Sequence, residues 1–210
     1  MGKTTGLLGG SFNPAHGGHR DISLFTCDAL DLDELWWLVS PGNPLKDKAR
    51  DMAPLKARLA SAQKMSRRSR IRATAIESEL GTRYTIDTLR ELKKRYPDRQ
   101  FVWIMGADNL AIFHKWRAWR DISREMPIVV IARPGYNESA LMAPAMAWLR
   151  RYMRPAREVR QWAEWSLPAI TILRFRADSR SATAIRRANP EWYSEYADRL
   201  VRDDVTRSLL

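Results

Sequence analysis

The sequence is poor in cysteine and has no long apolar run. Only one of its 210 residues is a cysteine, Cys27, which excludes an internal disulfide and is typical of a reducing compartment. No apolar run approaches the roughly 18 residues that cross a bilayer. The N-terminal segment MGKTTGLLGG lacks the apolar core of a secretory signal, and Gly6 breaks the myristoylation pattern. We therefore expect a soluble, cytoplasmic protein without a membrane partner.

Acidic residues are scarce relative to basic ones. The chain has 36 Lys and Arg against 24 Asp and Glu, a formal net charge of +12. Such a balance favours polyanionic partners, which include nucleic acids, phosphate-rich small molecules and anionic membranes. The densest basic run, MSRRSRIR at 65–72, contains no aromatic residue, whereas nucleic-acid surfaces usually interleave the two. We interpret it as a solvated helix end or loop and predict no nucleic-acid partner.

Short apolar runs alternate with amphipathic segments along the whole chain. A hydrophobic fraction of 45% and 9 Trp indicate a folded protein, and we expect a single domain over residues 1–210. Strands are expected at 5–9, 35–40, 71–76 and 170–175, and the segments 101–108 and 126–136 are each expected to be a strand that runs into a turn. Helices are expected at 18–31, 54–66, 85–96, 139–165 and from 181 onward. This alternation predicts an α/β fold with a parallel sheet.

Parallel sheets bind their ligands beyond the carboxyl ends of the strands. Five segments fall at or near such ends: Gly9–His19, Ser40–Lys48, Gly106–Asn109, Arg133–Tyr136 and Ser179–Arg186. We expect these segments to converge on one crevice.

The first of these segments, GGSFNPAHGGH, holds four glycines, a proline and two of the three histidines. Glycine lets a ligand approach the main chain. The helix expected to follow has free N–H donors and a partial positive charge at its start, which suit a phosphate. His16 and His19 are three residues apart, so both rings can face one side and donate hydrogen bonds to an anion.

Two other interpretations of His16 and His19 stay open at this point. The pair could bind a metal ion, but neither His114 nor Cys27 supplies a recognisable further ligand. The two rings could also be packed in the turn without a ligand. We predict a phosphate site and no protein-bound metal.

The same segment resembles the GxFxPxHxGH signature of the nucleotidyltransferase superfamily. SATAIRR at 181–187 resembles the second signature of that superfamily, which is of the SxTxIR type. The resemblance implies a Rossmann-like, doubly wound parallel sheet. It also implies a reaction that joins a nucleoside triphosphate to a phosphate group and releases pyrophosphate.

The middle of the chain is similar to bacterial nicotinate-nucleotide adenylyltransferases. The matching segments, in order, are YTIDTL at 84–89, IMGADNL at 104–110, FHKWRAW at 113–119 and ARPGY at 132–136. The resemblance therefore implies an enzyme of NAD biosynthesis. It would transfer the adenylyl group of ATP to nicotinate mononucleotide and give nicotinate adenine dinucleotide and pyrophosphate, with in-line attack and no covalent enzyme intermediate.

Site residues follow from the resemblance. The implied catalytic residues are His16, His19, Lys46 and Arg186. The implied ATP-binding residues are Gly9, Gly10, Ser11, Phe12, His16, His19, Gly106, Asp108, Ser181, Thr183 and Arg186. The implied nicotinate mononucleotide-binding residues are Ser11, Phe12, Lys46, Tyr84, Thr85, Trp116 and Arg133. Mg²⁺ is expected to enter with ATP rather than on a protein site.

Four of these residues have a specific implied role. Trp116 would stack on the pyridine ring, or merely pack in the core. Thr85, at a helix start, would read the nicotinate carboxylate. Asp108 would contact ribose hydroxyls, or cap a helix. Arg133 would meet the mononucleotide phosphate, or cover surface.

The chain departs from the family pattern at two points. The loop NPLKDK at 43–48 lacks the histidine that precedes the family lysine. We expect Lys46 to be that lysine, with Lys48 as the alternative. Arg180 stands before the second signature where the family usually has isoleucine, which leaves the adenine-side contact open.

Three rival functions are weighed against this one. The acceptor could be nicotinamide mononucleotide, which differs from the acid by one charge. The chain could be a nucleic-acid-binding module, for which the glycine-rich signature has no use. It could also be an inactive scaffold, although both signature histidines are intact. Exposed tryptophans at 139–165 would suit an interface or lid, so a homo-oligomer is left open.

Overall fold

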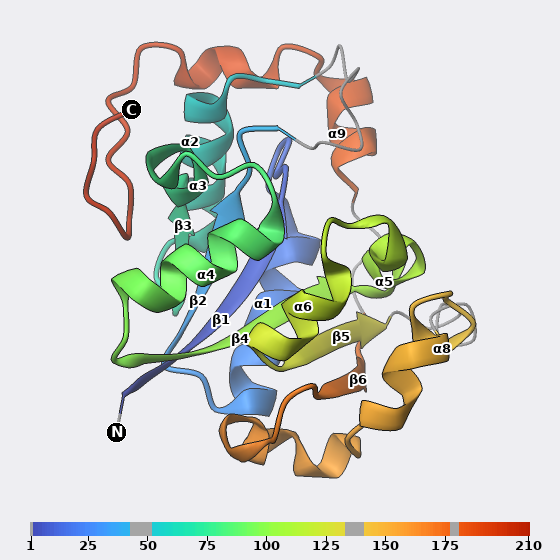
Figure 1. The fold of residues 1–210 in the computed structure, drawn as a ribbon. Coiled ribbons are helices and arrows are strands. Elements are labelled where there is room, and N and C mark those ends of the chain that lie inside the picture. Colours follow the sequence, from blue (N-terminus) through green and yellow to red (C-terminus); the bar gives the residue numbers. More distant parts are fainter. Residues whose placement is uncertain (1, 43–51, 133–140, 177–180) are drawn as a thin grey trace.

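The structure, a computed structural model, describes residues 2–42, 52–132, 141–176 and 181–210. Its centre is a six-stranded sheet in the order β3-β2-β1-β4-β5-β6 (Figure 1). The strands are β1 (Lys3–Gly10), β2 (Glu34–Val39), β3 (Ile71–Thr74), β4 (Arg99–Gly106), β5 (Ile128–Ala132) and β6 (Ile170–Arg174). All five pairings are parallel. The order reverses between β1 and β4, as in a doubly wound sheet, so the predicted fold class is confirmed.

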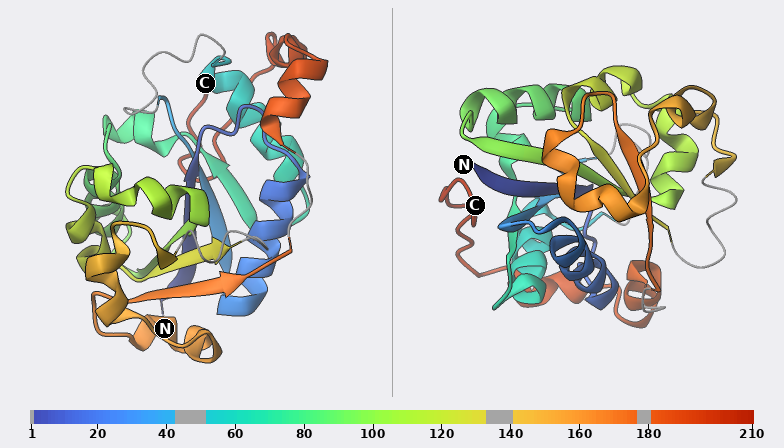
Figure 2. Two further views of the ribbon diagram at one scale, coloured as in Figure 1. Left: turned by 90° about the vertical axis from the view of Figure 1, so that its right-hand side faces the viewer. Right: turned by 90° about the horizontal axis from the view of Figure 1, so that it is seen from below.

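Helices cover both faces of this sheet (Figure 2). The α-helices are α1 (Gly17–Leu30), α2 (Leu55–Ser66), α3 (Ile76–Leu80), α4 (Thr85–Arg95), α5 (Ala107–Ile112), α6 (Trp119–Glu125), α8 (Met146–Leu149) and α9 (Ala182–Ala188). The 3₁₀ helices are η1 (Phe113–Lys115), η2 (Arg150–Tyr152), η3 (Ala156–Glu164) and η4 (Trp192–Tyr196). One face carries α1, α2 and η3, and the other carries α3 to α6 with α8. Within the described residues, no helix is long and apolar enough to cross a membrane.

Adjacent side chains of each strand enter opposite cores. In β2, Trp37 packs on the α1 side and Trp36 on the α4 side, and the two residues are 0% and 1% exposed. The Trp37 indole N–H donates to Ser23 Oγ at 2.7 Å, which satisfies its polar atom inside the core. Both faces of the sheet are buried. This explains why the strands consist of consecutive apolar residues rather than of alternating apolar and polar residues.

One expected strand ends earlier than predicted, and one predicted turn is the start of a helix. β3 stops at Thr74, because Thr74 Oγ1 accepts a hydrogen bond from the N–H of Ile76 at 3.1 Å and the chain turns into α3. β4 stops at Gly106, and α5 begins at once, so Asp108 lies in the first turn of a helix rather than in an open turn.

The segment 139–165 is less helical than its composition predicts. Its described part contains one short α-helix, α8, and the 3₁₀ helices η2 and η3. Pro155 precedes η3, and the Arg154 N–H donates to Ile170 O at 2.8 Å, so this stretch pairs with β6 instead of coiling. The prediction of exposed tryptophans was also wrong: Trp162 is 2% exposed, and Trp148 packs on Trp119 with ring centres 5.6 Å apart.

Candidate active site

The turn after β1 is built against two tryptophans. The Phe12 ring stacks on Trp37 with centres 4.9 Å apart, and Phe12 itself adopts a left-handed backbone with φ of 45°. A Cβ atom on Gly9 would lie 2.8 Å from the Trp103 ring, so glycine is required there by core packing. Because Phe12 is 2% exposed, its ring is unavailable to a ligand. Any ligand contact of Phe12 would go through its main chain, whose strained conformation is typical of ligand turns.

His16 and His19 stand together at the start of α1. Their ring centres are 3.8 Å apart, and His16 is 6% exposed. The His16 N–H donates to His19 Nδ1 at 3.2 Å. A neutral His19 therefore carries its proton on Nε2, where it can donate to a ligand. The N-terminal N–H groups and the dipole of α1 favour an anion at the same point.

The second signature lies against the first. The Arg186 guanidinium, from α9, donates to Asn13 O in the β1–α1 turn at 2.6 Å. Ser181 is the N-cap of α9, and its Oγ accepts a hydrogen bond from the Ala184 N–H at 3.2 Å. Thr183, in the first turn, is exposed. The two signature segments, which are far apart in the sequence, thus lie against each other at the β1–α1 turn. The sequence predicts this convergence.

A buried arginine of α2 ties three chain segments together beneath this turn. Arg58 is 1% exposed. Its Nε donates to Ala53 O at 2.8 Å, and its Nη1 donates to Ser11 O at 2.9 Å and to Ser40 O at 2.6 Å. Its Nη2 reaches Pro41 O at 3.4 Å. One side chain therefore fixes the turn after β1, the end of β2 and the entry to α2.

Among the described residues, no carboxylate forms an ion pair with Arg58. Burial lowers the pKa of its guanidinium to about 10, so it remains a cation at neutral pH. A desolvated positive charge next to Ser11 makes the turn after β1 more favourable for phosphate. We infer that Arg58 is a positioning residue of the site.

Arg58 is a site residue that the sequence signatures do not include. A signal for it exists, however. Leu55, Leu59, Ala62 and Met65 form one apolar face of the predicted helix, and Arg58 falls on that same face. An arginine in a core position needs buried acceptors, which in parallel sheets are often the carbonyls of nearby loops.

On the β4 side, Gly106 and Asp108 lie where the strand passes into α5. Asp108 is exposed, and its carboxylate folds back over Gly106, where a Cβ atom would collide with it. The N-cap position belongs to Gly106. Asp108 is therefore not the cap, and its carboxylate stands at the carboxyl end of the sheet.

Tyr84, Thr85 and Trp116 lie at the start of α4 and just after η1. Tyr84 is the N-cap of α4 and Thr85 its first residue. Trp116 is half-buried and meets Trp103 edge-on, with ring centres 6.3 Å apart. Trp103 also lies under Gly9. This indole, which the sequence motifs do not single out, therefore connects the phosphate turn with Trp116.

A cation lies beside the start of α4. The Arg117 guanidinium is 4.6 Å from the centre of the Tyr84 ring, and its Nη1 is 3.9 Å from Asp87 Oδ2. The Arg117 side chain is 60% exposed. Positive charge is thus available next to Tyr84 and Thr85 without being bound tightly to Asp87.

A half-buried carboxyl group, that of Glu77, is linked to Tyr84 through Thr88. Thr88 Oγ1 donates to Glu77 Oε1 at 3.1 Å, lies 2.8 Å from Thr82 Oγ1 and is 3.3 Å from Tyr84 O. Burial raises the pKa of Glu77 from 4.5 to about 7, although the Thr88 hydrogen bond acts in the opposite direction.

The raised pKa of Glu77 makes stability depend on pH. Because the folded protein holds this proton between pH 4.5 and about 7, the contribution is fully present below pH 4.5 and is lost as the pH rises through 7. Glu77→Gln stays neutral, so we expect it to raise the free energy of unfolding by up to about 3 kcal/mol at pH 8 and to change it little at pH 4.5. Urea unfolding at the two pH values measures this. An equal effect at both would contradict a buried acid.

Four predicted positions lie outside the described residues. They are Lys46 and its alternative Lys48, together with Arg133 and Arg180. Within the described part of the chain, no group of three or more His, Cys, Asp or Glu side chains is placed to hold a metal ion.

The switch point of a doubly wound sheet, with a histidine pair at a helix N-terminus, places the chain in the class of Rossmann-like nucleotide-binding proteins. Residues 7–188 match the cytidylyltransferase-like family, and the chain belongs to that family. A relative from Erythrobacter litoralis (strain HTCC2594), named "Probable nicotinate-nucleotide adenylyltransferase", is 64% identical over 96% of this chain and 92% of its own.

Further relatives agree in name and fold. A protein of the same name from Parvibaculum lavamentivorans is 49% identical over 88% of this chain and 92% of its own. The fold is similar to that of the solved Plasmodium falciparum nicotinic acid mononucleotide adenylyltransferase complexed with NaAD. The TM-score is 0.65 at 18% identity, over 88% of this chain and 83% of that one.

Proposed function

We propose that this protein is a nicotinate-nucleotide adenylyltransferase of NAD biosynthesis. It joins ATP to nicotinate mononucleotide and releases nicotinate adenine dinucleotide and pyrophosphate. The observation that carries the proposal is the contact between the two signatures, in which Arg186 donates to Asn13 O beside the histidine pair. The 64% identity to the Erythrobacter relative, over nearly all of both chains, supports it.

The proposed reaction needs no protein nucleophile. An oxygen of the mononucleotide 5′-phosphate attacks the α-phosphorus of ATP, and the bond from that phosphorus to the bridging oxygen breaks. Pyrophosphate leaves with the electron pair of that bond. Because the attacking group is already an anion, the task of the protein is in-line placement and charge stabilisation.

His16, His19 and Arg186 would surround the triphosphate. His19 would donate from Nε2, since its Nδ1 already accepts the His16 N–H. Arg186 would meet the leaving pyrophosphate, and Ser181 and Thr183 would add hydroxyl contacts. Lys46 is proposed for the same task. Mg²⁺ would be bound by the ATP phosphates rather than by a protein site, and it would supply positive charge that neutralises phosphate oxygens.

Trp116 and the start of α4 would hold the second substrate. The half-buried Trp116 ring offers a stacking face for pyridine. Thr85 and the neighbouring N–H groups would receive the carboxylate, with Arg117 contributing a positive charge. Asp108 would contact the adenosine ribose, and Arg133 would contact the mononucleotide phosphate.

Pyrophosphate release with ATP and Mg²⁺ tests the function, with nicotinate mononucleotide and nicotinamide mononucleotide compared as acceptors. A strong preference for the acid is expected. Arg117→Gln should reduce that preference about threefold, because an exposed cation contributes modestly. Arg120→Gln is the matched control. Its guanidinium lies 4.9 Å from the Trp119 ring, and the preference should stay unchanged. Release with neither acceptor, from a folded protein that binds ATP, would contradict the function.

A further inference from the structure

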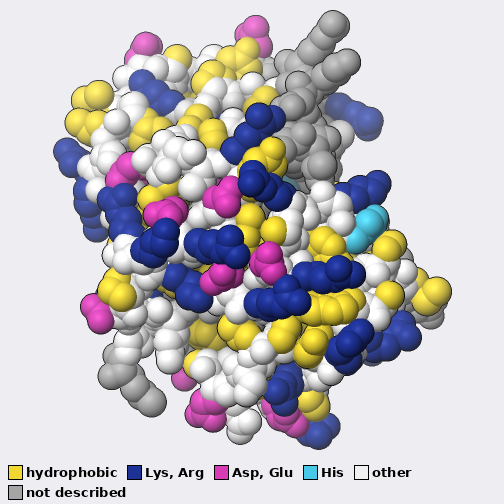
Figure 3. Space-filling view, viewed as in Figure 1, with side chains coloured by type: hydrophobic (Ala, Val, Ile, Leu, Met, Phe, Trp, Pro, Cys, Tyr) yellow, Lys and Arg dark blue, Asp and Glu magenta, His cyan; other side chains and the backbone are white. Residues whose placement is uncertain are grey.

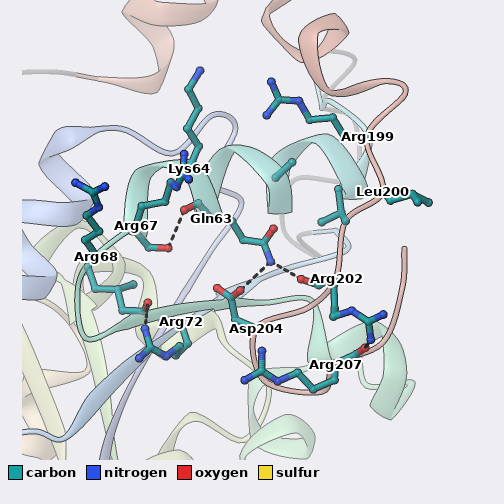
Figure 4. Close-up of a pocket in the computed structure, with 14 residues that line it drawn as sticks. Gln63, Lys64, Arg67, Arg68, Arg72, Arg199, Leu200, Arg202, Asp204 and Arg207 are labelled. Atoms are coloured by element: carbon teal, nitrogen blue, oxygen red, sulfur yellow. Dashed lines mark hydrogen bonds between the residues drawn. The ribbon is translucent and has the colours of Figure 1, made fainter.

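A second basic site lies in a groove apart from the active-site residues. The end of α2, the start of β3 and the C-terminal segment 199–207 form its walls, and its volume is about 870 Å³ (Figure 4). Lys64, Arg67, Arg68 and Arg72 come from the first two walls. Arg199, Arg202 and Arg207 come from the third.

The groove carries a large share of the protein's charge. Its 14 lining residues include these seven cations and one carboxylate, Asp204, a net charge of +6. The whole chain of 210 residues has +12. Asp204 is bound into the wall, because its Oδ1 accepts from Gln63 at 3.0 Å and its Oδ2 accepts from the Ala73 N–H at 2.9 Å.

Most of these cations are not balanced by an acid. Lys64 lies 3.0 Å from Glu195, and Arg72 Nε lies 3.9 Å from Glu34. For the other five arginines, no ion pair is found among the described residues. The face that α4 and α6 cover is different: there, Lys and Arg are interspersed with Asp and Glu (Figure 3). Clustered like charges repel, so they favour an anionic ligand between them.

Two of the groove arginines stand on strained backbone. Arg68 has a φ of 53° and Arg207 a φ of 66°. The left-handed region suits glycine, asparagine and aspartate, and arginine is unusual there. Strained residues of this kind are found mainly at functional sites. Glycine at either position would relax the backbone but would remove the guanidinium.

We propose that the groove binds a compact ligand that carries several phosphate groups, in addition to the substrates of the active site. Arginine binds phosphate through paired N–H donors. None of the described side chains that line the groove is aromatic, so they offer a nucleobase no stacking partner. Recognition therefore acts on the phosphate chain, which either inorganic polyphosphate or a nucleoside polyphosphate supplies.

Calorimetric titration with inorganic tripolyphosphate tests the site in three proteins: the wild type, the double variant Arg68→Gly with Arg207→Gly, and Arg157→Gln. Arg157→Gln removes one positive charge outside the groove, where the double variant removes two inside it; the Arg157 side chain is 81% exposed on η3 and lies 3.5 Å from Glu158. The wild type should bind tripolyphosphate either at one additional site or about tenfold more tightly than the double variant. Arg157→Gln should bind like the wild type. The double variant should keep its pyrophosphate release and its melting temperature, because glycine suits both backbones.

Two further titrations identify the source of the phosphates. The affinity that the double variant loses is compared for tripolyphosphate and CTP. If the two ligands lose the same affinity, the phosphate chain alone is recognised. If CTP binds more tightly, the ligand is a nucleoside polyphosphate. Equal weakening by Arg157→Gln and the double variant would overturn the proposal, because binding would then be diffuse. A single-stranded RNA that binds through the groove and that tripolyphosphate does not displace would also overturn it, in favour of nucleic acid.

Discussion

Replacing His19 with alanine is expected to lower the turnover number by about 10²–10³-fold, the usual loss when one donor to a transition-state anion is removed. The fold should tolerate the change. The substitution removes the 3.2 Å hydrogen bond from the His16 N–H and the ring contacts with Phe12 and His16, a loss of about 1–3 kcal/mol. Steady-state pyrophosphate release gives the turnover, and thermal unfolding gives the stability.

His114→Ala is the control for His19→Ala. His114 is the third histidine and lies in η1, which is not part of either signature. Its loss should leave the turnover close to that of the wild type. If His19→Ala also turned over at near-normal rates, His19 would have no part in the chemistry, and the phosphate turn would have to act through its main chain alone.

Replacing Arg58 with methionine is expected to lower the free energy of unfolding by about 4 kcal/mol. The methionine side chain fills a similar space but leaves the buried carbonyls of Ser11, Ser40 and Ala53 without their donor. A loss of this size is a large part of the stability of an ordinary domain. Urea unfolding at pH 7 measures it.

Arg58→Lys separates the charge of Arg58 from its geometry. Lysine restores the cation but cannot reach all the carbonyls that the planar guanidinium spans. We expect Arg58→Lys to have a KM for ATP close to that of the wild type, while its free energy of unfolding stays below the wild-type value. If Arg58→Met were as stable as the wild type and had the same KM for ATP, two roles of Arg58 would be contradicted. It would neither stabilise the contact between the loops nor supply positive charge for ATP binding.

Much of the fold follows from local sequence signals. The apolar runs of β1, β2 and β4 and the pattern of α4 give the alternation of a parallel sheet, and the reversal of strand order follows the predicted fold class. The meeting of the two signatures also follows, because both lie after strands whose carboxyl ends share one edge. The hydrogen bond from Arg186 to Asn13 O is the contact that joins the two signatures.

The supports of the site could not be predicted in the same way. Arg58 binds carbonyls from segments that meet only in the folded sheet. Because every residue type has a main-chain carbonyl, the sequence does not show which ones an arginine will bind. Gly9 was expected to open the main chain to a ligand, whereas it also makes room for Trp103, a residue of another strand. The short helices α3 and α5 follow their strands almost at once. The apolar pattern therefore extended the predicted strand into α3, and the small residues after β4 were interpreted as a turn rather than as α5.

The adjacent tryptophans of β2 also act on the folding of the sheet. A β2 strand paired one residue out of step with β1 would carry Trp37 to the α4 side and Trp36 to the α1 side. Trp37 would lose its hydrogen bond to Ser23 and its stack on Phe12. Trp36 would lose its edge-on contact with Tyr96. A misaligned sheet is therefore penalised in both cores at once, and Trp36 and Trp37 together mark the native alignment of the two strands.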